Sequence, residues 1–285
     1  MSEENVTNDL FYSEAYDYMY VPFRFSQRVV GHVILNFLND NHFFMPPLYL
    51  VIEGSPGQGK TLQTIAACNK RRIAVKYVSA SRLSGQKEGD SRKALEEIYK
   101  EAVELVSRKT YTCILIDDFH MGNAAVDDKT NHTINSNLLI GYIMNLAESI
   151  NKCRIPIILT GNDFSNVYPA LIRNGRADIF LWEPTHQEKF AIIRTLYEPV
   201  LRETSEKNLH NFFRKYSNEN IAFFSQLIND WRRSYIDEII INFDVLTEEN
   251  LQRMSDEIHQ KLPKITIQEL NDLAIKRLNE RRRSG

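Results

Sequence analysis

A glycine-rich segment, residues 54–61 with the sequence GSPGQGKT, has the residue types and spacing that bind a polyphosphate. It fits the P-loop pattern GxxxxGK followed by Ser or Thr. Glycines let such a loop turn its backbone N–H groups inward, and the helix that follows adds a partial positive charge. We expect Lys60 to reach the β and γ phosphates and Thr61 to bind Mg²⁺. The predicted nucleotide-binding residues of this loop are Gly54, Ser55, Pro56, Gly57, Gln58, Gly59, Lys60, Thr61 and Leu62.

A pair of acids, Asp117 and Asp118, ends the apolar segment CILI at residues 113–116. This pattern is typical of a Walker B strand. Asp117 is then placed to hold Mg²⁺, directly or through water, and Asp118 to orient the attacking water as a base. Two acids at a strand end also serve as helix caps or solvated loops, and the P-loop favours the catalytic interpretation.

Three further polar residues lie where a hydrolytic site would use them. Asn162 follows the apolar segment 155–160 and is predicted to polarise the same water, with an Asx turn as the structural alternative. Arg173 and Arg176 flank a glycine turn. They are either solvated surface arginines or an arginine finger that a neighbouring subunit supplies to the γ-phosphate.

Apolar segments alternate with helical patterns from residue 48 onward, which predicts an α/β fold. Short apolar runs at residues 48–53, 73–78, 112–117, 155–160 and 178–182 are expected to be strands. Strands that alternate with helices form parallel sheets covered on both faces. The expected architecture is a three-layer αβα domain with a five-stranded parallel sheet, followed by a small, mainly helical lid domain.

Three regions are predicted along the chain. Residues 1–20 form an acidic, tyrosine-rich arm, which is either a docking arm or a strand or helix on the surface. Residues 21–184 form the nucleotide-binding α/β domain. Residues 185–285 form the helical lid, where Thr185 with Glu188 fits a capping box and Thr266 is expected to cap a second helix.

Composition limits the classes of partner. A net charge of −2 and a pI near 6.4 give no overall field that attracts nucleic acid or an anionic membrane, so nucleic acid is not the expected partner. No stretch approaches the roughly 20 apolar residues of a membrane span. Three separated cysteines and no basic-apolar leader predict a reducing, cytoplasmic location.

The segments 160–165 (TGNDFS), 171–176 (LIRNGR) and 182–185 (WEPT) closely resemble Rubisco activase, and the resemblance covers about residues 22–240. It implies a P-loop AAA+ fold and a ring, expected to be a hexamer, that hydrolyses ATP and pulls on a protein client. Rubisco is one possible client. On this resemblance Arg173 and Arg176 act between subunits, Asn162 is sensor 1, residues 83–89 are the first pore loop, and Arg232 or Arg233 is sensor 2.

Two other classes of function stay open at this point. One is a nucleic-acid-associated AAA+ loader, which only the basic clusters at residues 281–283 and 70–72 support; such clusters at helix ends are usually solvated. The other is a regulatory ATP switch that assembles with little turnover. Steep salt dependence of nucleic-acid binding would favour the first, and a steady-state hydrolysis rate separates the second.

Overall fold

The structure of the 285-residue chain is a computed structural model. It describes residues 10–11, 16–38, 45–79, 83, 90–119, 141–146, 154–165, 173, 175–240, 247–261 and 263–284. The chain divides into two compact units, residues 1–183 and 184–285. Within the described residues, no helix is both long and apolar enough to cross a lipid bilayer.

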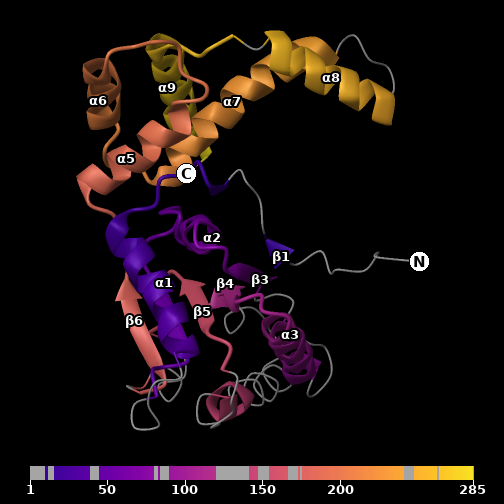
Figure 1. Cartoon of the computed structure of the whole chain (residues 1–285). Helices are drawn as coiled ribbons and strands as arrows, with labels where there is room; N and C mark the ends of the chain where they lie inside the picture. Colours follow the sequence, from indigo (N-terminus) through magenta and orange to yellow (C-terminus); the bar gives the residue numbers. More distant parts are fainter. Residues whose placement is uncertain are drawn as a thin grey trace. The chain divides into compact units, whose positions relative to one another are not determined.

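Within the described residues, the first unit contains one six-stranded sheet in the order β1-β3-β4-β5-β2-β6. Figure 1 labels its strands β1, β3, β4, β5 and β6. Five strands are parallel, as predicted, and only the two-residue β1 runs antiparallel, against β3. The strands are β1 (Leu10–Phe11), β2 (Tyr49–Glu53), β3 (Ala74–Ser79), β4 (Thr112–Asp117), β5 (Ile157–Gly161) and β6 (Ala177–Leu181). The strand β1 places this part of the tyrosine-rich arm on the edge of the sheet.

Helices cover both faces of the sheet, which makes the predicted three layers. The helices of this unit include α1 (Phe23–Phe37), α2 (Lys60–Asn69) and α3 (Asp90–Ser107). Ile114 of β4 belongs to the same buried cluster as Leu95 of α3. The next residue back, Cys113, points to the other face, where its Sγ lies 3.8 Å from Sγ of Cys68 in α2. Successive strand residues therefore alternate between the two helical layers.

The predicted strand ends differ from the observed ones by at most two residues, and those of β4 coincide. The largest shift is in β5, which begins at Ile157 and not at Ile155. Pro156 has no N–H to give to the ladder, although its carbonyl accepts a hydrogen bond from Ile114 N at 3.0 Å. Between β4 and β5, where the alternating pattern predicts a helix, residues 141–146 are described and are helical. Of the predicted first pore loop, residues 83–89, the structure describes Leu83 alone, and the other residues of that loop lie outside the described residues.

The second unit is helical, as predicted. Its helices are α5 (His186–Tyr197), α6 (Glu206–Lys215), α7 (Ile221–Ile240), α8 (Glu248–Lys261) and α9 (Ile267–Ser284). The capping box of Thr185 and Glu188 at α5 is confirmed. Thr266 likewise caps α9, because its Oγ1 accepts a hydrogen bond from Glu269 N at 3.2 Å. The role of this unit as a lid and the exact domain limits stay predictions.

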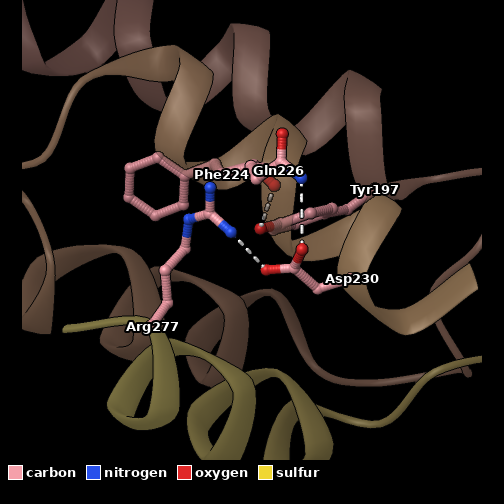
Figure 2. Close-up of polar contacts among 5 residues, drawn as sticks. All are labelled: Tyr197, Phe224, Gln226, Asp230 and Arg277. Carbon is pink, nitrogen blue, oxygen red and sulfur yellow. Dashed lines mark hydrogen bonds and ion pairs between the residues drawn. The ribbon is translucent and has the colours of Figure 1, made fainter. Parts of the chain in front are cut away.

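Aromatic packing and a polar network join α5, α7 and α9. Phe212, Phe224 and Trp231 belong to one buried cluster with residues of α9. Figure 2 shows the polar contacts beside it: Arg277 Nη1 of α9 lies 2.7 Å from Asp230 Oδ2 of α7, and the hydroxyl of Tyr197 donates to Phe224 O at 3.0 Å. Gln226 donates to the second oxygen of the Asp230 carboxylate at 3.1 Å. Each oxygen of this carboxylate therefore has a donor.

Candidate nucleotide-binding site

The glycine loop lies at the carboxyl end of β2, where open parallel sheets bind their ligands. The strand β2 has β5 on one side and β6 on the other, and the chain leaves it for β3, two strands beyond β5. Gly57 and Gly59 have positive φ angles of 73° and 77°, which side chains rarely adopt. Gly59 is also the N-cap residue of α2, so the loop ends at a helix N-terminus.

Gly54 is required by close packing and not by its backbone angles. A Cβ atom at this position would lie 2.1 Å from the carbonyl oxygen of Trp182. Trp182 follows β6, and its backbone N donates to Glu53 O at 2.6 Å. Its indole Nε1 donates to Gln58 O at 2.9 Å. Trp182, which is fully buried, thus holds both the start and the middle of the loop.

Lys60 folds back over the loop. Its Nζ donates to the carbonyl oxygens of Gly54 and Ser55 at 2.6 and 3.0 Å, and to Oδ1 of Asn162 at 2.9 Å. Burial lowers the pKa of Lys60 below its usual value, and the charges of Asp118, Glu183 and Asp117 oppose that shift. A bound polyphosphate would supply the negative charge that favours the protonated amine.

Three hydroxyl groups surround the carboxylate of Asp117 at the end of β4. Thr61 donates from its Oγ1 to Asp117 Oδ1 at 2.6 Å, and Thr160 of β5 donates to the same oxygen. The phenol of Tyr77 in β3 donates to Oδ2 at 3.2 Å. This contact, together with burial, raises the pKa of Tyr77, with burial the largest cause. The hydroxyl and carboxylate oxygens of Thr61 and Asp117 are the hard ligands that Mg²⁺ prefers.

Asp118 has an unusual backbone conformation, and the side chain of Asn162 contacts Lys60. Asp118 is exposed and has a φ angle of 52°, a left-handed conformation that Asp tolerates better than most residues. Its N–H donates to Thr160 Oγ1 at 3.3 Å. The Asx-type contact belongs to Asp163, whose Oδ1 accepts from Ser165 N at 2.7 Å. The side-chain oxygen of Asn162 accepts a hydrogen bond from Lys60 Nζ beside the glycine loop.

The remaining predicted site residues lie elsewhere. Arg176 directly precedes β6, and its carbonyl accepts from Tyr49 N at 3.1 Å. The strands β2 and β6 run parallel, and Arg176 precedes the start of β6. Arg173 and Arg176 therefore lie at the amino-terminal end of the strands, whereas the loop lies at the carboxyl-terminal end. Leu62 is exposed in the first turn of α2. Arg232 is exposed on α7 in the second unit, so its contact with nucleotide stays a prediction.

Sequence reasoning missed four residues that contact this site: Thr160, Tyr77, Trp182 and Glu183. Glu183 accepts a hydrogen bond from Ser55 N through its Oε1 at 2.6 Å. None of the four stands in the glycine loop or in the acid pair. The position of Thr160 at the end of an apolar run was the only signal in the sequence. The other three are recognised only once strand pairing is known.

Residues 50–185 match the protein family described as ATPase family associated with various cellular activities (AAA). This segment is an AAA domain. Its limits include the glycine loop, the acid pair, Asn162 and both arginines of the turn. The resemblance to Rubisco activase also holds over most of the chain, as three relatives show.

The AAA domain and its flanks are similar to three curated proteins named ribulose bisphosphate carboxylase/oxygenase activase. The protein of Anabaena sp. (strain CA / ATCC 33047) is 33% identical over 242 residues, 79% of this chain and 55% of that protein. The protein of Nostoc sp. is 33% identical over 250 residues, 83% of this chain and 58% of the relative. The chloroplastic activase 1 of Nicotiana tabacum is 31% identical over 237 residues, which are 78% of this chain and 52% of that protein. This chain thus spans little more than half the length of these relatives.

Proposed function

We propose that this chain binds ATP with Mg²⁺, hydrolyses it, and uses the energy to remodel a protein client as part of a ring. The observation that carries the proposal is the convergence of Lys60, Asn162, Thr61 and Asp117 at one glycine loop. These residues come from three separate segments of the chain. Their meeting at the N-terminus of α2 supports a site built for a polyphosphate and not a glycine turn.

The proposed role of the loop is to bind and orient the phosphate chain. In the structure, Lys60 Nζ is held by the carbonyl oxygens of Gly54 and Ser55, which places the amine over the loop. Phosphate oxygens would share this amine and receive the backbone N–H groups of the loop. Tight loop geometry depends on Gly57 and Gly59, because both have positive φ.

Thr61 and Asp117 are the proposed residues of a metal site. Mg²⁺ held there would neutralise charge on the β and γ phosphates and polarise them toward attack. Thr160 and Tyr77 hold the Asp117 carboxylate in position from the two neighbouring strands. Asp118 is proposed to accept the proton of the attacking water, and Asn162 to orient that water.

Arg173 and Arg176 support assembly into a ring. They lie at the opposite end of β6 from the loop, and the paired strand between Tyr49 and Glu53 is about 13 Å long at roughly 3.3 Å per residue. That separation disfavours contact with the γ-phosphate of their own chain. We propose that they reach the nucleotide of a neighbouring subunit, in a ring that we expect to be hexameric.

The client is proposed to be a protein. The relatives are named as activases of ribulose bisphosphate carboxylase/oxygenase, so Rubisco is a candidate client. A variant that binds ATP without hydrolysing it, Asp118→Asn, should hold a client long enough for capture. Purified Rubisco retained by Asp118→Asn with ATP, and released without ATP, would support this client.

The central experiment measures hydrolysis as a function of protein concentration. We expect Mg²⁺-dependent ATPase activity that rises with assembly, is lost in Lys60→Ala, and falls about 10³-fold or more in Arg176→Ala. Mixing Arg176→Ala with Lys60→Ala subunits should restore part of the activity, because each supplies what the other lacks. Activity that survives Lys60→Ala, or an Arg176→Ala ring with unchanged turnover, contradicts the mechanism. Arg202→Ala, an exposed arginine of the second unit, is the matched control.

A further inference from the structure

Glu183 lies beside the phosphate loop, where the first unit ends. The last pair of the ladder joins Glu53 to Leu181, and Trp182 N continues it with a hydrogen bond to Glu53 O. Residues 182 and 183 therefore run alongside the first residues of the loop. The carboxylate of Glu183 takes the N–H of Ser55 at 2.6 Å, and its carbonyl accepts from Arg24 Nη2 at 3.0 Å.

A carboxylate is an unexpected neighbour for a loop that binds anions. The loop concentrates backbone N–H groups and the positive end of α2, and both favour negative charge. Glu183 is exposed, and no ion pair joins its carboxylate to a cation among the described residues. Because it accepts from Ser55 N at 2.6 Å, this carboxylate lies beside the backbone N–H groups that would receive phosphate oxygens.

Glu183 has two separate effects on the site, one as a hydrogen-bond acceptor and one as a negative charge. As a hydrogen-bond acceptor, Glu183 holds Ser55 N and so supports the start of the loop, together with Trp182. As a negative charge, it repels any phosphate chain that binds to the glycine loop. A glutamine would keep the acceptor oxygen and remove the charge, so the two effects can be measured separately.

We infer that Glu183 is an affinity-determining residue of the site: it supports the loop through Ser55 and lowers affinity for nucleotide in proportion to the charge of the phosphate chain. This inference rests on the proposed nucleotide binding. Its consequence for the cycle is faster nucleotide release, because repulsion acts mainly on the bound state. ATP, which carries one phosphate more than ADP, is the ligand on which the charge acts most.

The test compares Glu183→Gln and Glu183→Ala with the wild-type chain by calorimetric titration of ATP and ADP. We expect Glu183→Gln to bind ATP about threefold to tenfold more tightly, with a smaller gain for ADP. The gain should shrink as salt is raised from low to high ionic strength, since the contact is exposed. Glu183→Ala should gain less than Glu183→Gln, because it also loses the acceptor for Ser55 N.

The matched control is Glu97→Gln, which makes the same change of net charge at an exposed position of α3. It should leave both affinities unchanged. Glu183→Gln that binds ATP no better than the wild type, or a Glu97→Gln gain of equal size, overturns the inference while nucleotide binding itself stands. A wild-type chain that binds neither nucleotide overturns the proposed function and the inference together. Unchanged thermal unfolding of Glu183→Gln checks that the fold is retained.

Discussion

The phenol of Tyr77 donates to Oδ2 of Asp117 across 3.2 Å, from the strand beside the one that carries the acid. In the parallel ladder, Ser79 is paired with Asp117 and Tyr77 with Leu115. Paired residues point to the same face of the sheet, and Leu115 and Asp117 are two residues apart on β4. Tyr77 therefore lies on the same face as the carboxylate, the face covered by α2. The other carboxylate oxygen takes the hydroxyls of Thr61 and Thr160.

Tyr77→Phe is predicted to raise the Mg²⁺ concentration needed for tight nucleotide binding by about threefold to tenfold, which corresponds to the roughly 1 kcal/mol of one hydrogen bond. The carboxylate loses the donor that orients Oδ2, while the loop that binds phosphate is untouched. Titration of Mg²⁺ against a fluorescent ATP analogue measures the midpoint. Affinity without metal should not change.

Tyr111→Phe, which removes the hydroxyl of an exposed tyrosine, is the control and should leave the Mg²⁺ midpoint unchanged. An unshifted midpoint in Tyr77→Phe would show that Thr61 and Thr160 orient Asp117 without the phenol.

Gly54→Ala is predicted to lower the thermal stability of the nucleotide-binding unit and to abolish tight nucleotide binding. The new Cβ would meet the backbone oxygen of Trp182 at 2.1 Å, and backbone atoms on paired strands cannot move cheaply. We expect a cost of about 1–3 kcal/mol. Differential scanning calorimetry and nucleotide titration measure the two effects.

The matched control is Gly31→Ala in α1, where a Cβ meets nothing within 4 Å. Alanine in a helix should stabilise the chain by roughly 0.5–1 kcal/mol. Equal effects of the two substitutions would refute the close approach of Trp182 as the reason for Gly54.

His32 is predicted to make the nucleotide-binding unit less stable in mild acid. Burial lowers its pKa from 6.5 to about 4, while the contact of Nε2 with Leu48 O, at 3.2 Å, acts in the opposite direction. The unfolded chain takes up a proton below pH 6.5, whereas the folded chain does so only near pH 4. The stabilisation from neutral His32 is therefore complete above pH 6.5 and is lost progressively as the pH falls toward 4.

Between pH 7 and pH 5 this linkage amounts to about 2 kcal/mol. Thermal unfolding of wild type and His32→Gln at both pH values measures it, because the variant should lose less stability than the wild type over that interval. His210→Gln, at an exposed histidine of the second unit, should behave like the wild type. Parallel losses in wild type and His32→Gln would rule out His32 as the source.

Much of the fold follows from local patterns. The five parallel strands were predicted because buried strands of an α/β sheet are short apolar runs, and each run here is followed by a loop or helix signal. The caps at Thr185 and Thr266 were predicted because a cap is local: each hydroxyl accepts a hydrogen bond from the backbone N–H only three residues ahead. The antiparallel β1 was not identified as a strand of this sheet, because two residues carry too little pattern and their partner, β3, is more than 60 residues away.

The candidate site divides in the same way. Spacing alone identified residues 54–61 and the acid pair, since a phosphate loop is a local structure whose glycines, lysine and threonine are consecutive. Asn162 was found at a strand end, but the hydrogen bond that its oxygen accepts from Lys60 was not predicted, and the Asx-type contact beside it belongs to Asp163. Likewise, only the parallel pairing of β2 with β6 shows that Arg173 and Arg176 lie at the end of the strands away from the loop.

The sequence by itself determined that a glycine loop, an acid pair and alternating strands and helices make a nucleotide-binding α/β domain, because each of these signals lies within a few consecutive residues. Only the tertiary structure decided what surrounds the loop. Trp182 and Glu183 reach it because β6 pairs with β2, and Tyr77 reaches Asp117 because β3 pairs with β4. The physical reason is that hydrogen bonds between strands, and not sequence distance, determine which side chains meet at the carboxyl-terminal ends of the strands.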